Sequence, residues 1–170
     1  MCKLKVTELN RLTPEAYKES PKIPLVVILD HIRSLNNVGS VFRTSDAFRV
    51  ESIYLCGITA CPPNVEIHKT ALGAEESVDW RYFEDTLEAV DNLKQQGFVV
   101  CAVEQVEGSV MLDKLLLDKN KKYAEVKGVQ QSVVDKCDMC IEVPQFGTKH
   151  SLNVSVTTGI VIWELFKQLR

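Results

Sequence analysis

"PLVVILD", residues 24–30, is a short continuous apolar run that a carboxylate closes. An unbroken run of this length is typical of a strand that is covered on both faces. Residues 36–48 then carry apolar side chains at helical spacing, and Asn36 or Asn37 is suited to cap that helix. A buried strand followed by an amphipathic helix indicates the start of a parallel α/β arrangement.

Strand and helix patterns continue to alternate through the first hundred residues. Apolar runs predict further strands at residues 52–56, 78–83 and 98–103. The segment from Asp85 to Gly97 predicts a helix that has a polar start and a glycine stop. This alternation predicts an α/β fold with a mostly parallel sheet flanked by helices, and such sheets bind ligands beyond the carboxyl ends of their strands.

The second half of the chain is less regular, beginning with a charged stretch at residues 107–127. We expect, in order, a short helix at 111–117, a turn at 118–122, a helix at 132–136, a strand at 140–143 and a loop at 144–150. The final segment alternates like a strand at first and later fits a helix. Its length favours a helix that begins near Ser151, because serine caps helices well and a typical strand has only about six residues.

Length and composition predict one compact domain over residues 1–170, because 45% hydrophobic residues suffice for a sizeable core. The formal charge of −3 means that any nucleic-acid site must be a local basic patch. Residues 1–20 mix charged and apolar side chains rather than forming an apolar leader. The uncharged stretch at 152–163 is shorter than the roughly 20 residues of a membrane span, so we expect a non-secreted, cytoplasmic protein without a membrane segment.

The cysteines are better explained as buried free thiols than as disulfides, because several lie inside apolar runs. The six are Cys2, Cys56, Cys61, Cys101, Cys137 and Cys140. The last two have the spacing of a metal or redox pair, yet no second pair and no paired histidines accompany them. We therefore expect no metal site, and a Cys-x-x-Cys metal or redox protein is a minor alternative.

Two separated polar segments could hold a ligand. The segment from Asn36 to Gly39 lies at a strand-to-helix junction, where backbone donors suit an anion, and Arg43 further along the helix could clamp a phosphate. The loop at 144–153 combines a glycine, a hydroxyl and an amide, while Val143 and Leu152 could contact an apolar or aromatic group. Taken singly, these segments are equally consistent with a helix cap and an ordinary loop.

The ordered pair "LNNVGSVFRTSDAF" (35–48) and "VPQFGTKHSLNVSVTTGIVIWE" (143–164) resembles the first and third motifs of the SpoU/TrmH branch of the SPOUT RNA methyltransferases. "HKTALGAEESVDW" (68–80) resembles the middle region of that family, so the likeness covers nearly the whole chain. The resemblance implies a SPOUT fold with a C-terminal trefoil knot, and S-adenosylmethionine-dependent methylation of a ribose 2'-hydroxyl in tRNA or rRNA. It also implies a homodimer in which the partner helps to complete the site, with Trp163 and Phe166 at the interface.

The same resemblance assigns site residues by motif position. Asn37 and Arg43 match the active-site amide and arginine of the first motif, and Ser151 and Asn153 match the Ser-Leu-Asn of the third, so these four are the expected catalytic residues. The expected cofactor-binding residues are Glu125, Gly128, Val143, Gly147 and Leu152. A free guanidinium has a pKa above about 12, so Arg43 either acts as a strongly perturbed base or binds phosphate and orients the ribose hydroxyl.

One segment departs from the family pattern. An apolar strand and Gly-x-Glu normally precede the Glu-x-x-Gly that Glu125 to Gly128 matches, whereas here Ala124 runs directly into it. This departure predicts that a strand end and its glycine are missing. Their loss would leave a catalytically inactive RNA-binding protein on the same fold, which is the alternative function.

Overall fold

Seven strands form one sheet in the computed structural model, which describes residues 3–5, 8 and 10–170. In spatial order they are β3 (Trp80–Phe83), β2 (Val50–Cys56), β1 (Ile23–Asp30), β6 (Lys122–Lys127), β4 (Phe98–Val103), β7 (Met139–Glu142) and β5 (Val110–Met111). Every neighbouring pair is parallel. The predicted α/β fold with a parallel sheet is confirmed.

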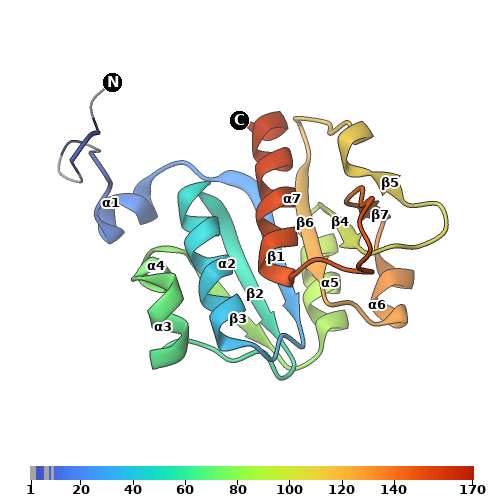
Figure 1. Ribbon diagram of the computed structural model, residues 1–170, viewed down its shortest axis with the longest axis horizontal. Coiled ribbons are helices and arrows are strands. Elements are labelled where there is room, and N and C mark those ends of the chain that lie inside the picture. The colour runs from blue at the N-terminus through green and yellow to red at the C-terminus, as the bar shows by residue number, and fades with distance from the viewer. Residues whose placement is uncertain (1–2, 6–7, 9) are drawn as a thin grey trace.

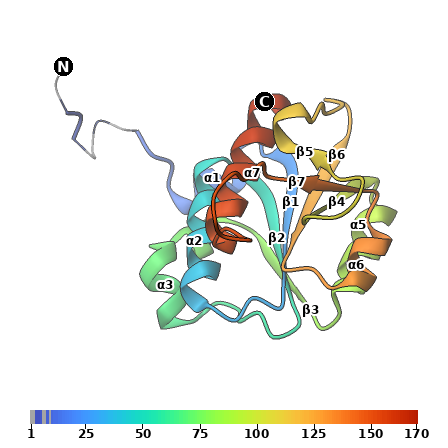
Figure 2. The same cartoon turned by 45° about the vertical axis from the view of Figure 1, so that its right-hand side comes forward.

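Helices cover both faces of this sheet (Figures 1 and 2). The helices are α1 (Pro14–Glu19), α2 (Leu35–Ala47), α3 (Val65–Ala71), α4 (Ala74–Ser77), α5 (Thr86–Gln95), α6 (Gln131–Lys136) and α7 (Val154–Leu169). α2 and α7 lie on one face, with α3 and α4 beside α2, and α5 and α6 lie on the other. None of the helices in the described part of the chain has the length and apolar character needed to cross a membrane.

The central strand β1 explains why its sequence is an unbroken apolar run. Leu25, Val27 and Leu29 belong to the core under α2 and α7, whereas Val26 and Ile28 belong to the core under α5. All five are at most 1% exposed. Burying a side chain of this size stabilises the fold by about 1.5–3 kcal/mol, and a strand covered on both faces gains this at every position.

Two predicted helix starts are corrected by the structure. α2 is capped by Ser34, whose Oγ accepts a hydrogen bond from the Asn37 amide at 3.3 Å, so Asn37 lies in the first turn. α7 begins at Val154 rather than near Ser151, because the Oδ1 atom of Asn153 accepts from the Ser155 amide at 2.9 Å. Asparagine and serine are both strong N-cap residues. Where two candidates stand close together, the backbone conformation at the helix start decides which of them caps the helix.

The interval between β4 and β6 also differs from expectation. The helix predicted at residues 111–117 is absent, and β5 is followed only by a 3-10 turn at Leu112–Lys114. Leu112 and Leu115 are buried in the core, so their apolar character reflects tertiary packing rather than helical periodicity. The short helices α1, α3 and α4 were not predicted.

The strand end predicted to be missing is present. β6 lies at the centre of the sheet and pairs in register with β1 and with β4, with Glu125 opposite Val27 and Cys101. Gly128 follows the strand with φ +80°. The prediction of a missing strand end was wrong because two charged residues, Glu125 and Lys127, disguise a buried strand, whereas the family's Gly-x-Glu remains absent before Glu125. The trefoil knot stays a prediction, since strand order alone does not define how the chain threads.

Candidate functional site

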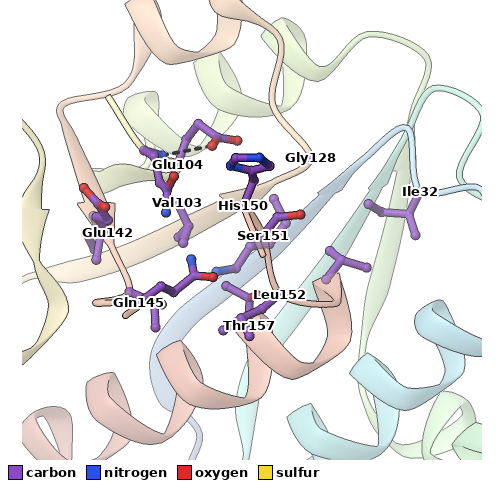
Figure 3. A pocket seen from close by; sticks show the side chains of 15 residues that line it. Ile32, Val103, Glu104, Gly128, Glu142, Gln145, His150, Ser151, Leu152 and Thr157 are labelled. Atoms are coloured by element: carbon purple, nitrogen blue, oxygen red, sulfur yellow. Dashed lines mark hydrogen bonds between the residues drawn. The ribbon is translucent and has the colours of Figure 1, made fainter. Parts of the chain in front are cut away.

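A cavity of about 210 Å³ lies at the carboxyl ends of β4, β6 and β7, beside the first turn of α7 (Figure 3). It is lined by Ile32, Val103, Glu104, Gln105, Lys127, Gly128, Ile141, Glu142, Val143, Gln145, His150, Ser151, Leu152, Val154 and Thr157. This is the edge of a parallel sheet at which ligands bind. The loop between β7 and α7 supplies one wall, which brings the third motif to the strand ends.

The cavity has walls of two kinds. Val103, Ile141 and Val143 at the strand ends are buried and apolar, which suits a flat aromatic group. Polar groups come from the strand-end residues Glu104 and Glu142 and from the loop before α7 (Figure 3). Two carboxylates near one cavity favour a ligand that carries positive charge.

Gly128 shapes the floor of the cavity and cannot be replaced without strain. Its φ of +80° lies in the left-handed region, and an added Cβ would lie 2.6 Å from the carbonyl oxygen of Asp30. Glycine therefore allows the turn after β6 to lie directly against the end of β1. The sequence-based expectation that Gly128 lies in the ligand site agrees with its place in the cavity lining.

The two motifs meet beside this cavity. The Oδ1 atom of Asn37 accepts hydrogen bonds from Asn153 Nδ2 at 3.2 Å and from Ser155 Oγ at 3.4 Å. Asn37 and Asn153 are 116 positions apart in sequence. Ser151 lines the cavity two residues before Asn153. The structure thus brings three of the four predicted catalytic residues into one region.

Arg43, the fourth predicted catalytic residue, lies apart from them in this chain. It is exposed on α2 and lines a shallow depression with Asp46, Gly73 and Glu76 rather than the main cavity. Six residues along a helix correspond to about 9 Å and to a different side of it, so Arg43 and Asn37 do not face one point.

Of the five predicted cofactor-binding residues, three line the cavity and two do not. Gly128, Val143 and Leu152 line the cavity, whereas Gly147 lies in the exposed loop with open space around it. Glu125 is fully buried inside β6 and is not part of the lining. Sequence reasoning missed four titratable lining residues: Glu104, Lys127, Glu142 and His150. Glu104, Lys127 and Glu142 could have been predicted from the sequence, because each lies at or just after the end of a strand, where ligands bind in parallel sheets.

Lys127 and Glu125 form a buried ion pair on one side of β6. Lys127 Nζ lies 3.7 Å from Glu125 Oε2, and their side chains are 2% and 0% exposed. Burial lowers the pKa of Lys127 and raises the pKa of Glu125, and the attraction between the two opposes both shifts. At 3.7 Å the pair is too long for a hydrogen bond, and in the described residues neither Lys127 Nζ nor either Glu125 oxygen has another partner.

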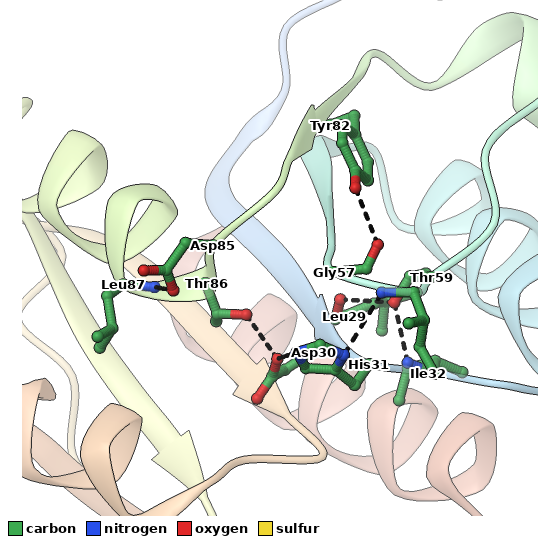
Figure 4. A network of polar contacts seen from close by, with 11 residues as sticks. Leu29, Asp30, His31, Ile32, Gly57, Thr59, Tyr82, Asp85, Thr86 and Leu87 are labelled. Atoms are coloured by element: carbon green, nitrogen blue, oxygen red, sulfur yellow. Dashed lines mark hydrogen bonds and ion pairs between the residues drawn. The ribbon is translucent and has the colours of Figure 1, made fainter.

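A second polar network fixes the turn that leads into α2 (Figure 4). Thr59 Oγ1 donates to the Leu29 carbonyl at 3.1 Å and accepts from the Ile32 amide at 2.9 Å. Thr86 Oγ1 donates to Asp30 Oδ1 at 2.5 Å. These three hydrogen bonds hold the carboxyl end of β1, so they also position the helix start that carries Asn37.

The Cys-x-x-Cys pair has the properties of packed thiols. Cys137 and Cys140 are free and half-buried, and desolvation raises the pKa of Cys137 to about 12. A reactive or metal-binding cysteine needs the opposite shift. Within residues 3–5, 8 and 10–170, no group of three potential ligands is placed to hold a metal ion. Cys2 lies outside the described residues.

Comparison with known proteins places this site in context. The chain is 29% identical over 168 residues to the 23S rRNA (guanosine-2'-O-)-methyltransferase RlmB of Nitrosomonas europaea, a match that covers 96% of this chain and 64% of that protein. The chain spans 62–65% of the length of the curated relatives it matches.

Solved structures have the same architecture. The A. aeolicus TrmH/SpoU tRNA modifying enzyme superposes with a TM-score of 0.78 at 26% identity, covering 91% of this chain and 79% of that one. The AdoMet-bound rRNA methyltransferase from Sinorhizobium meliloti superposes with a TM-score of 0.78 at 23% identity, covering 92% and 60%, which shows the shared fold. The model of the SpoU rRNA Methylase family matches residues 24–163. This segment contains every strand of the sheet except the first residue of β1, and both motifs except the last residue of the second, Glu164. The chain therefore belongs to the SpoU rRNA methylase family.

Proposed function

We propose that this chain methylates a ribose 2'-hydroxyl of tRNA or rRNA, with S-adenosylmethionine as the methyl donor. The observation that carries the proposal is the hydrogen bond between Asn37 and Asn153 beside the strand-end cavity. It joins the two segments whose sequences match the family, next to a cavity suited to the cofactor. The methyltransferase names of the relatives support the same activity.

The residues of the cavity fit S-adenosylmethionine. Its apolar walls suit the adenine ring, and Glu104 and Glu142 suit the cationic sulfonium and ammonium groups. When bound, the cofactor supplies an electrophilic methyl group on sulfur. Ser151, Leu152 and Gly128 would hold it chiefly through backbone groups, since glycine and leucine offer no side-chain donor.

The protein's own part in the reaction is to position the ribose, whose hydroxyl proton leaves to water as the oxygen takes up the methyl group. In-line attack on a methyl group requires the hydroxyl oxygen to be held near the cavity and to lose its proton. Ser151 lines the cavity and Asn153 is held beside it by Asn37, which supports a role for both as donors to the ribose oxygens. Arg43 supplies positive charge for the phosphate and orients the hydroxyl, because its guanidinium is a poor base.

Arg43 can reach this site only from another copy of the chain, so we propose a homodimer. One side of α7 presents Val156, Ile160 and Trp163, which are 52%, 37% and 47% exposed. Trp163 also packs on Phe48 of α2, with ring centroids 5.6 Å apart. A contiguous apolar stripe of this kind marks a protein interface, and pairing through it would place α2 of one copy near the α7 start of the other.

The non-catalytic alternative rested on a missing strand end. β6 is present and central, so the strand part of that support is removed, while the Gly-x-Glu expected before Glu125 remains absent from the sequence. No other observation favours an inactive RNA-binding protein over an enzyme.

Tritium transfer tests the proposal. Purified protein, labelled S-adenosylmethionine and total tRNA or rRNA should give labelled RNA, and Arg43→Ala should abolish the transfer. Arg81→Ala, which removes a guanidinium from exposed β3, should leave it unchanged. Calorimetry that detects no cofactor binding would refute the proposal, and mapping ribose methylation in cells that lack the protein would identify the RNA.

A further inference from the structure

Lys127 is an unusual residue for the centre of a parallel sheet. Lysine is almost never fully buried unless it is paired, because desolvating an ammonium is costly. Here the side chain is 2% exposed and lines the cavity, and its Nζ has no hydrogen-bond partner among the described residues. A buried donor without a hydrogen-bond partner destabilises the ligand-free protein, and a ligand that carries an acceptor would remove this cost.

The charge around Lys127 restricts what that acceptor can be. Glu125, 3.7 Å away, already neutralises the ammonium, and Glu104 and Glu142 add two further carboxylates to the cavity lining. A second anion, such as the cofactor's own carboxylate, would add negative charge to a region that already has an excess of it. A neutral acceptor supplies the missing hydrogen bond and leaves the charge balance unchanged.

We propose that Lys127 is a cofactor-binding residue that donates a hydrogen bond to a ring nitrogen of the adenine base. The apolar strand ends Val103, Ile141 and Val143 then hold the faces of the ring. Glu104 and Glu142 attract the sulfonium and ammonium at the other end of the cofactor. Glu125 keeps the ammonium neutralised, so that it does not repel the sulfonium. This role rests on the proposed function, because it assumes that the cavity binds S-adenosylmethionine.

A series of ring analogues tests the hydrogen bond directly by binding rather than by activity. Calorimetry would compare S-adenosylhomocysteine with its 1-deaza, 3-deaza and 7-deaza forms, each of which replaces one ring nitrogen by C–H. Hydrogen bonds from charged donors correspond to about tenfold or more in affinity. One analogue should therefore bind the unaltered protein at least about tenfold more weakly than the parent compound does.

Variants identify the donor. In Glu125→Leu/Lys127→Met, which removes both charges and so leaves no unpaired ion, the penalty for that analogue should disappear. Lys121→Met removes the same charge from an exposed turn and should keep the penalty. A penalty that persists in the double variant would overturn the role of Lys127, and the analogue series on the unaltered protein tests the hydrogen bond independently of how that variant folds.

The outcomes also separate this inference from the proposed function. Tight binding of S-adenosylhomocysteine with equal affinity for all three analogues would overturn the role of Lys127 alone. An ordered water would then satisfy its Nζ. Absence of any binding to the unaltered protein would overturn the cofactor assignment and this inference together.

Discussion

Removing Lys127 alone should destabilise the protein much more than removing it together with Glu125. At 3.7 Å and an effective dielectric constant of about 20, the attraction between the two charges is about 4–5 kcal/mol. Lys127→Met leaves a carboxylate buried in the central strand, and breaking a buried pair in this way costs about 3–5 kcal/mol. The double variant Glu125→Leu/Lys127→Met should be as stable as the natural protein or more so, since apolar replacement of a buried pair is often neutral or stabilising.

The stability lost in Lys127→Met should also depend on pH, in a direction that the pKa of Glu125 determines. Lys127 holds the pKa of Glu125 down, so its removal lets burial raise that pKa further. A carboxyl group whose pKa is higher in the folded than in the unfolded protein stabilises the folded state fully at pH values below its unfolded pKa of about 4.3. That stabilisation is lost as the pH rises through the folded pKa. The deficit of Lys127→Met should therefore be smaller at pH 5 than at pH 8.

Urea unfolding followed by circular dichroism, at one fixed protein concentration, measures these differences. For a chain of this size, 3–5 kcal/mol corresponds to a fall in Tm of about 6–20 °C. Two results would refute the reasoning: a Lys127→Met protein within about 1 kcal/mol of the natural one, or a double variant as unstable as the sum of the two single variants.

Four further substitutions have defined outcomes. Gly39→Ala should lower the free energy of unfolding, measured by chemical unfolding, by about 1–3 kcal/mol, because the added Cβ would lie 2.3 Å from the Ile67 carbonyl oxygen. Gly147→Ala is the control: the loop has open space there, so the free energy of unfolding should change by less than about 0.5 kcal/mol. Gly128→Ala should cost about 1–3 kcal/mol from backbone strain and weaken S-adenosylhomocysteine binding in calorimetry, and unchanged affinity would remove Gly128 from the site. Trp163→Asp should turn a dimer into a monomer in size-exclusion chromatography with light scattering, and a natural protein that elutes as a monomer would contradict the proposed interface.

Pattern reading succeeded where one physical effect dominates. β1, β4 and residues 53–56 of β2 are largely buried, so their sequences are the apolar runs typical of a covered strand. α5 has a polar cap at Asp85 and an apolar stripe, and both signals are local. The caps of α2 and α7 were misplaced by two or three residues, because several good capping residues stand in succession and the choice depends on tertiary contacts.

The candidate site could be predicted from the family resemblance but not from local sequence patterns. Asn37 and Asn153 look like ordinary helix-start residues when each is read alone, and only the family resemblance paired them. Their 3.2 Å hydrogen bond joins segments 116 residues apart, a contact that no local pattern specifies. Arg43 marks the limit of a single chain, since the place in the site that we propose for it depends on a second copy.

β6 shows why functional positions are hard to read from periodicity. Residues 123–127 of this strand are all buried, yet Glu125 and Lys127 break the apolar run that would mark a buried strand. A core gains no stability from such a pair, because well-packed apolar residues of similar size do as well or better. A buried charge that stability does not require, at a strand end beside a cavity, is therefore itself a signal of ligand binding. Reading the two charged residues as a gap concealed both the strand and the donor that we assign to the cofactor.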